Sequence, residues 1–177
     1  PSMDAHFRAI SSENCPPFTR QGQEAWALVL RVVDGDTIEV GLFIPSLFGG
    51  ARQWRIRLLG VNAPETKLGL NVTEEEKLHG LACKRMLSDF IEHKLVYVRF
   101  PPVAHNDFYG RQLASVALLG FDSKGSETET DIARWLLDMT TAVPYDDPTA
   151  SRPKNFDFQR VQNQDYLRCR LTGAYAT

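Results

Sequence analysis

The sequence predicts a single, mainly β domain of the α+β class, in which five strands flank one long helix. Short runs rich in β-branched and aromatic residues alternate with clusters of turn residues, which is typical of strands. One longer stretch instead carries apolar residues at helical spacing. A length of 177 residues with 43% apolar residues is enough for one substantial core.

The first three strands are predicted from apolar runs and the turns between them. Residues 25–33 are dominated by Ala, Leu and Val, and the β-branched residues at 37–40 follow an Asp-Gly-Asp turn. Residues 53–61 alternate between two faces and predict a third strand. That strand should end near Pro64, because proline lacks the backbone N–H that a β-ladder needs.

A long helix is predicted at residues 73–93. Thr73 and Glu76 have the spacing of a capping box, which marks the start of a helix. Its apolar residues recur at helical spacing and should face the strands: Leu78, Leu81, Ala82, Met86, Leu87 and Phe90.

The rest of the chain predicts two more strands and two more helices. The strands are expected at residues 95–100 and 112–119, with a turn at 107–110 between them. A second helix is expected at residues 129–139, and a closing helix at 156–169.

The overall charge excludes a protein that binds nucleic acid or membranes through a broad basic surface. The 20 Lys and Arg residues nearly balance the 22 Asp and Glu residues, so any phosphate binding must be local. No apolar run approaches the roughly 20 residues of a membrane helix, and no leader opens the chain, so we expect a soluble protein without a membrane partner. The compartment stays open. The three cysteines are far apart and are interpreted as unpaired thiols: Cys15, Cys83 and Cys169.

Three short clusters hold most of the chemical information. They are residues 34–37, Arg57 with Asn62 and Glu65, and residues 107–111. Each has an ordinary structural explanation: an Asp-Gly hairpin turn, an arginine pointing outward from a strand, and a tight turn with a solvated arginine. Taken together, however, they contain the groups that phosphodiester hydrolysis requires.

Oxygen donors in two of these clusters suit a hard cation. Calcium binds carboxylate, amide and backbone carbonyl oxygens, and Asp36, Asn62 and the backbone carbonyl of Ala63 supply one of each. Arg57 and Arg111 offer planar forks of donors that match two phosphate oxygens. Glu65, on a loop directly after a proline, could accept a proton from the attacking water.

The three clusters resemble the signatures of staphylococcal nuclease homologues. Residues 33–37, 57–66 and 109–111 match these signatures in order and separation, within a similarity that spans residues 25–142. The resemblance implies a five-stranded OB-fold barrel packed with about three helices. It also implies a nuclease domain at residues 24–143, between an irregular arm at 1–23 and a C-terminal extension at 144–177, expected to be helical and packed on the barrel.

The resemblance also implies roles for individual residues. Asp36 and the carbonyl of Ala63 would bind calcium, and Asp34 and Thr37 would lie beside these ligands. Tyr109 would contact a substrate phosphate. Three residues would be catalytic: Arg57, Glu65 and Arg111.

Two positions depart from the family pattern. Asn62 stands where an aspartate is usual, so we expect weaker calcium binding or a preference for another divalent cation. Phe108 replaces a basic residue and could stack on a base of the substrate.

The expected function is a calcium-dependent nuclease that cuts DNA or RNA with little sequence specificity and prefers single strands. The presence of Asn62 keeps a second interpretation open, in which the barrel binds nucleic acid or a protein and has weakened or lost catalysis. A third interpretation, an unrelated β-rich domain, would require all three clusters to be coincidental turns.

Overall fold

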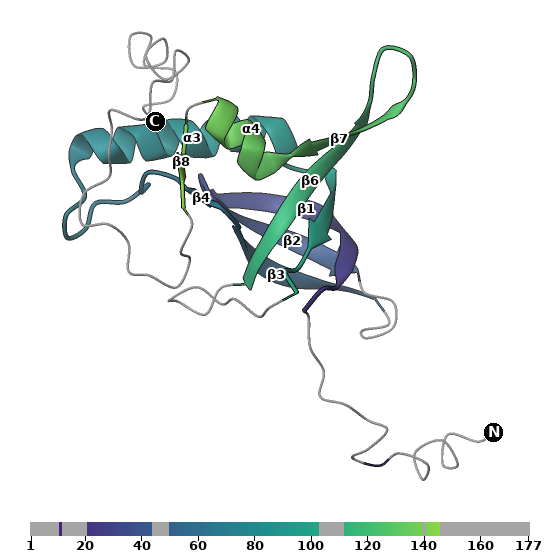
Figure 1. Cartoon of the computed structure of the whole chain (residues 1–177). Helices are drawn as coiled ribbons and strands as arrows, with labels where there is room; N and C mark the ends of the chain where they lie inside the picture. The colour runs from purple at the N-terminus through teal and green to yellow at the C-terminus, as the bar shows by residue number, and fades with distance from the viewer. Residues whose placement is uncertain (1–10, 12–20, 44–49, 103–111, 140, 146–177) are drawn as a thin grey trace.

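Five strands curl into a closed barrel (Figure 1). The computed structural model describes residues 11, 21–43, 50–102, 112–139 and 141–145. The sheet order is β3-β2-β1-β5-β6, and a parallel pairing of β3 with β6 closes the ring. The barrel strands are β1 (Glu24–Asp34), β2 (Thr37–Phe43), β3 (Ala51–Leu58), β5 (Leu95–Arg99) and β6 (Gln112–Phe121). This architecture confirms the mainly β, five-stranded fold that the sequence predicts.

The first hairpin follows from alternation along the first half of β1 and along β2. Every second residue of β1 from Ala25 to Val29 lies in the core, and the residues between them face outward. Asp34 lies opposite Thr37, so the turn between the strands is very tight. Gly35 is required in it, because a Cβ there would lie 2.6 Å from the sulfur of Cys83.

The third strand ends earlier than the sequence suggests. β3 stops at Leu58 instead of residue 61, because Gly60 adopts a left-handed φ of +83° that only glycine takes readily. The chain then forms β4 (Val61–Asn62), which pairs antiparallel with β8 (Val143–Pro144). Tyr145 donates its backbone N–H to the carbonyl of Gly60 at 3.0 Å. The turn after β3 is thus held by the last described residues of the chain.

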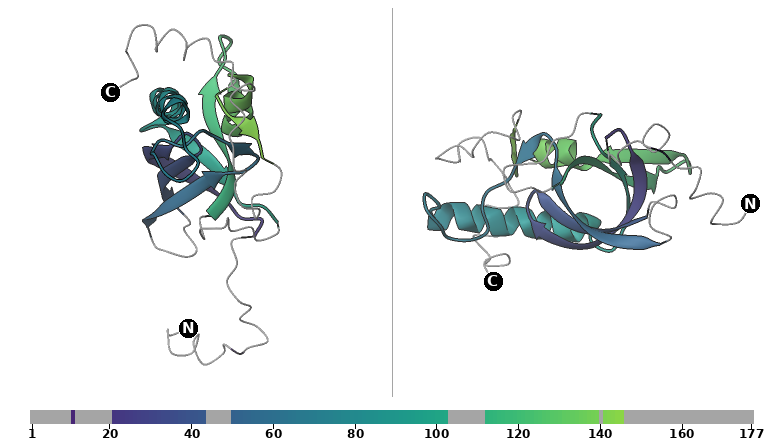
Figure 2. Two further views of the ribbon diagram at one scale, coloured as in Figure 1. Left: turned by 90° about the vertical axis from the view of Figure 1, so that its left-hand side faces the viewer. Right: turned by 90° about the horizontal axis from the view of Figure 1, so that it is seen from below.

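The long helix α3 (Glu74–Ile91) packs along one side of the barrel (Figure 2). It begins as predicted, since Thr73 is the N-cap and its side-chain oxygen accepts the N–H of Glu76 at 3.1 Å. Three of its residues join the barrel core: Cys83, Leu87 and Ile91. Ala82 is also buried. The predicted apolar stripe is therefore correct for its central turns, while Leu78 and Leu81 are only half-buried.

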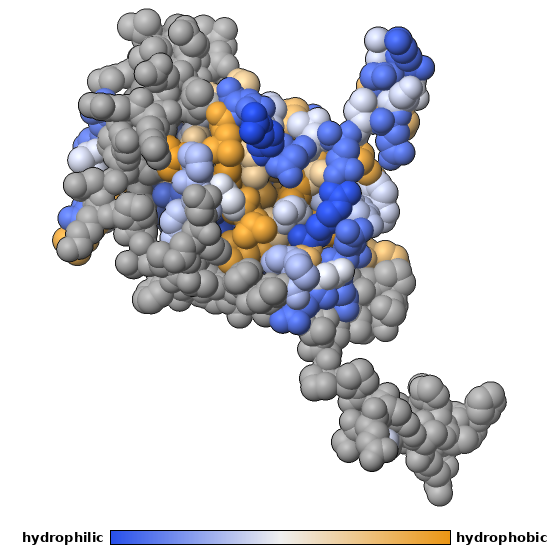
Figure 3. Space-filling model, viewed as in Figure 1, coloured by the Kyte–Doolittle hydropathy of each residue, from blue (hydrophilic) through white to orange (hydrophobic). Residues whose placement is uncertain are grey.

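The second predicted helix starts too early. Residues 129–131 belong to β7 (Glu127–Asp131), which pairs with β6 in a hairpin that projects from the barrel and has a mostly hydrophilic surface (Figure 3). Helix α4 (Ile132–Asp138) begins where the Asp131 side chain accepts the N–H of Arg134 at 2.7 Å. Phe90 of α3 stacks on Trp135 of α4, with ring centroids 4.1 Å apart.

Some expectations fall on residues that the structure does not describe. These are most of the arm at 1–23, the turn at 107–110, and most of the C-terminal extension with its predicted helix at 156–169. Neither α3 nor α4 combines the length and the apolar character that crossing a bilayer would need.

Candidate active site

Asp36 links the first hairpin to the loop after β4. It is buried, and its backbone carbonyl accepts the N–H of Leu58 at 2.8 Å. One carboxylate oxygen, Oδ1, accepts the hydroxyl of Thr37 at 2.9 Å, and the other, Oδ2, accepts the backbone N–H of Ala63 at 2.8 Å. The carboxylate therefore fixes the distance between two segments that are remote in sequence.

Arg57 reaches the same carboxylate from β3. Its Nη1 donates to the carbonyls of Leu58 and Val61 at 2.9 and 2.6 Å, and its Nη2 donates to Oδ1 of Asn62 at 3.1 Å. The same Nη2 lies 3.3 Å from Oδ2 of Asp36. Arg57 is only 5% exposed, so the interpretation of this residue as a solvated surface arginine is wrong. Two predicted metal ligands and one predicted phosphate-binding residue thus meet at one nitrogen atom.

The loop that carries Glu65 is held by helix α3. The backbone N–H of Glu65 donates to Oε1 of Glu76 at 3.1 Å, and the Glu76 residue is only 2% exposed. One turn further along the helix, a Cβ at Gly80 would lie 2.2 Å from the carbonyl oxygen of Glu65. The loop therefore lies directly on the helix backbone, which leaves little freedom to its position.

A second acidic residue and a thiol complete the surroundings of the first hairpin. Asp34 accepts a hydrogen bond from the hydroxyl of Thr66. The thiol of Cys83 donates to the carbonyl of Gly35 at 3.7 Å from beneath the turn. Burial raises the pKa of Cys83 to about 12, and the negative charge of Asp36 acts in the same direction. Cys83 is therefore a packing residue at neutral pH and not a nucleophile.

The donor set around Arg57 fits a calcium ion in chemical type. Asp36 offers a carboxylate and Asn62 an amide oxygen, and both point at one cationic nitrogen, so they already converge on a positive charge. Across the described ranges, no three His, Cys, Asp or Glu side chains form a cluster suited to a metal. The ligands predicted from the sequence include only one carboxylate, so they would not form such a cluster.

Hydrogen bonds and an ion pair join five of the ten residues that the sequence singles out: Asp36, Thr37, Arg57, Asn62 and Ala63. Asp34 binds Thr66 instead, and Glu65 contacts Glu76 through its backbone N–H. Three others lie outside the described residues: Phe108, Tyr109 and Arg111. Gln112, the first described residue after them, lies opposite Ile56, the neighbour of Arg57 on β3.

Sequence reasoning missed three residues that shape the site. Glu76 was expected only to cap its helix, yet its carboxylate binds the loop of Glu65. Thr66 binds Asp34, and the ring of Tyr145 lies 5.8 Å from the guanidinium carbon of Arg57. Of the three, only Thr66 lies within a family signature, residues 57–66, and Glu76 belongs to the capping box. Tyr145 directly follows β8, whose pairing with β4 places it.

A comparison with known protein families agrees with this geometry. The family model described as staphylococcal nuclease homologue matches residues 55–166, which is more than half of the chain. The chain belongs to the staphylococcal nuclease homologue family. A search among curated proteins finds no match.

The match to the staphylococcal nuclease homologue family starts inside β3. It covers Arg57, Asn62 and Glu65 but not the hairpin of Asp34 and Asp36. Asp36 lies outside the matched segment, and its contact with Arg57 therefore brings a further acidic group next to that segment. Members of this family have an OB-fold barrel and typically depend on calcium, and nucleic acid is the substrate that membership implies.

Proposed function

We propose that the chain is a calcium-dependent nuclease that hydrolyses phosphodiester bonds in DNA or RNA with little sequence specificity and prefers single strands. The observation that supports this most strongly is the meeting of Asp36, Arg57 and Asn62 at one nitrogen atom. Near this point, the loop of Glu65 is held in place by helix α3. A cation site, a phosphate-binding group and a proton acceptor are the components that metal-assisted hydrolysis needs.

Three residues would hold the cation in this proposal: Asp36, Asn62 and the backbone carbonyl of Ala63. When bound, calcium would polarise a phosphoryl oxygen and offset its negative charge. Arg57 now lies between the first two of these ligands. If Nη2 of Arg57 turned toward a substrate phosphate, the oxygens of Asp36 and Asn62 would be free to bind the cation instead.

The remaining residues act on the substrate itself. Arg57 and Arg111 donate hydrogen bonds to the non-bridging oxygens, where negative charge grows in the transition state. Glu65 accepts a proton from the water whose oxygen attacks phosphorus, and the bond from phosphorus to the leaving oxygen breaks. Tyr109 contacts the phosphate and Phe108 stacks on a base. Residue 111 directly precedes Gln112, which lies opposite Ile56, and this supports the role of Arg111 beside Arg57.

Cleavage of labelled single-stranded DNA and RNA in a calcium titration tests the proposal. We expect Glu65→Gln to lower kcat by about 10²- to 10⁴-fold, as loss of a proton-transfer group does. We expect Arg57→Lys to lower it as well, since lysine lacks the planar fork. The matched controls Glu127→Gln on β7 and Arg85→Lys on α3 change similar charges on exposed side chains outside the site, and both should cut at the native rate.

Equal cutting by all five proteins would contradict the proposal. Cleavage supported by manganese or magnesium but not by calcium would retain the nuclease and reject the metal assignment. Binding of single strands without cleavage in any of these metals would favour the second interpretation, a binding module, for which the neutral amide at Asn62 is the supporting observation.

A further inference from the structure

We propose that single-stranded nucleic acid runs from the candidate active site across the outer face of β1, β2 and β3, with phosphates on two arginines and bases on two aromatic rings. We call this surface the outer track. It consists of Arg31, Glu39, Gly41, Arg55, Phe43 and Trp26. The inference rests on the proposed nucleic-acid substrate and adds the path that the strand takes outside the reacting centre.

The pleat of β2 and β3 places this track in line with Arg57. Core residues occupy alternate positions of β2, so the residues between them face outward. Thr37 lies opposite Arg57, and Glu39 lies opposite Arg55, one step along the same face. From Thr37 to Phe43 the outer face extends for about 20 Å, which is the length of several nucleotides of an extended strand.

Next to the site, a buried carboxylate holds two arginines in position. Oε1 of Glu39 accepts Nε of Arg31 at 2.9 Å and also binds the amide of Gln53. Its Oε2 accepts Nη2 of Arg31 at 3.0 Å and Nη2 of Arg55 at 3.3 Å. The side chains of Arg31 and Arg55 are nevertheless 56% and 51% exposed. Two guanidinium groups around one carboxylate leave a local positive charge that a phosphate can approach.

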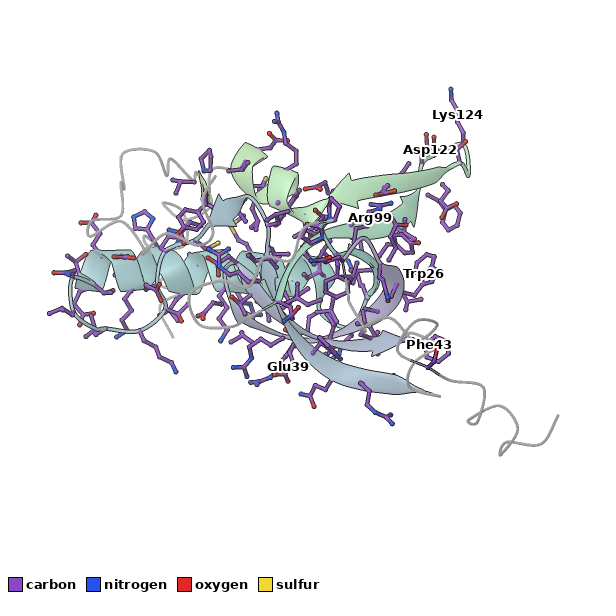
Figure 4. The ribbon with its side chains drawn as sticks, turned by 60° about the horizontal axis from the view of Figure 1, so that its bottom comes forward. Trp26, Glu39, Phe43, Arg99, Asp122 and Lys124 are labelled. Carbon is purple, nitrogen blue, oxygen red and sulfur yellow. The ribbon has the colours of Figure 1, made fainter. Side chains whose placement is uncertain are left out.

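Further along the track, the surface changes from charged to aromatic. Gly41 contributes no side chain, and its register partner Leu28 is 40% exposed, so the middle of the track is low and apolar. Phe43 and Trp26 follow as register partners on β2 and β1, and they are 47% and 46% exposed. Figure 4 shows Glu39 and Phe43 along the same edge of the barrel, with Trp26 beside Phe43.

The aromatic end is pre-positioned for stacking. Trp26 packs edge-on against Tyr97 of β5, with centroids 5.1 Å apart and planes at 71°. A ring that is fixed on one side and half exposed on the other offers a platform to an unpaired base. Beyond Tyr97, Arg99 is paired with both Glu24 and Glu129, so the surface there is acidic overall and the track ends.

The order of these features favours a single strand over a protein or a duplex. Guanidinium groups followed by exposed rings suit a chain that repeats phosphates and flat bases. A duplex keeps its bases stacked and would leave both rings without a partner. The whole chain carries a net charge of −2, so a local cluster of this kind is needed for phosphate binding.

Fluorescence anisotropy with a labelled single-stranded oligonucleotide tests the track on the full chain. A chelator in the buffer prevents cleavage, so binding is measured alone. We expect the double variant Arg31→Gln/Arg55→Gln to raise Kd about tenfold and to flatten the slope of log affinity against log salt by about 1.4, or about 0.7 for each lost phosphate contact. We expect Phe43→Ala to raise Kd at least about fivefold at all salt concentrations, through the loss of one stacked base.

Two control variants change similar residues elsewhere. Arg85→Gln removes an exposed arginine of α3 that pairs with Asp89, and Phe121→Ala removes an exposed ring at the end of β6. Both should bind the oligonucleotide as the native chain does. Native affinity in the arginine double variant and in Phe43→Ala would overturn the track.

The proposed cleavage is measured separately on the native chain, so the two proposals fail in different ways. If the native chain cleaves and the track variants bind as it does, the track is refuted and the nuclease proposal is retained. If the track variants bind more weakly and the native chain does not cleave, the track is supported and the nuclease proposal is refuted.

Discussion

The carboxylate of Glu76 accepts the backbone N–H of Glu65 at 3.1 Å, which joins the first turn of helix α3 to the loop of the candidate active site. Glu76 is buried, so this contact is shielded from water and holds the loop firmly. We expect Glu76→Gln to retain most of the activity, because the amide oxygen can still accept the N–H of Glu65. Glu76→Ala should lower kcat far more than it changes KM, and should destabilise the fold by about 1–3 kcal/mol.

Steady-state cleavage kinetics and urea unfolding of the two variants measure these effects. Glu75→Ala removes the neighbouring, exposed carboxylate and should behave like the native chain. A Glu76→Ala variant that loses stability but keeps the native kcat would show that Glu76 supports the fold and does not position Glu65.

The close approach of α3 to the Glu65 loop predicts an unusual effect of alanine at position 80. Alanine normally stabilises a helix by about 1 kcal/mol relative to glycine. Gly80→Ala should instead destabilise by about 1–3 kcal/mol, because its Cβ would lie 2.2 Å from the carbonyl oxygen of Glu65. Gly69→Ala meets nothing within 4 Å and should be nearly neutral. Thermal unfolding of the two variants compares them, and a Gly80→Ala variant more stable than the native chain would refute this packing.

The amide of Asn62 predicts a gain of metal affinity on substitution. Asn62→Asp adds a negative charge beside Asp36, where the proposed calcium ligands meet, and should lower the calcium Kd by about tenfold. The rise of Tm with calcium concentration measures this affinity, and adding a chelator should reverse the rise. Asn71→Asp makes the same change on an exposed turn and should leave the affinity unchanged. Equal calcium affinities for all three proteins would show that Asn62 is not a ligand.

Glu39 predicts a pH dependence of stability. Its hydrogen bonds to Arg31, and also to Gln53 and Arg55, lower the pKa of Glu39 from 4.5 to about 2. A carboxylate with a lowered pKa stabilises the fold fully above its ordinary pKa and loses that contribution as pH falls from about 4.5 toward 2. Urea unfolding between pH 6 and pH 3 should therefore show a steeper loss of stability for the native chain than for Glu39→Gln. Parallel curves would contradict this assignment.

Local patterns predicted the strands and the start of the long helix, because these depend on neighbouring residues. The tight hairpin follows from the Asp-Gly turn, and Thr73 caps α3 as its sequence indicates. The end of β3 could not be predicted in the same way. The turn at Gly60 depends on pairing with residues 143–144, which no pattern around position 60 reveals.

The burial of Arg57 was also beyond local reasoning. Alternation correctly places it on the outer side of β3, where an arginine is normally solvated. The backbone carbonyls of Leu58 and Val61 accept hydrogen bonds from its guanidinium group. The carboxylate of Asp36 balances its charge, and the side-chain oxygen of Asn62 accepts a further hydrogen bond. Likewise, Glu76 has the spacing of a capping residue, and only the tertiary fold directs its carboxylate to Glu65.

The short pairing of β4 with β8 works as a clasp, which links Asn62 to Val143 near the end of the described chain. The barrel strands all precede β8 in sequence, so during synthesis a ribosome completes them before the partner of Asn62 emerges. A shortened version of the protein that ends at residue 142 would keep every barrel strand. It would lose the pairing of β4 with β8 and the ring of Tyr145 beside Arg57. The natural stopping point for a minimal domain is therefore no earlier than Tyr145, whose backbone closes the clasp on Gly60.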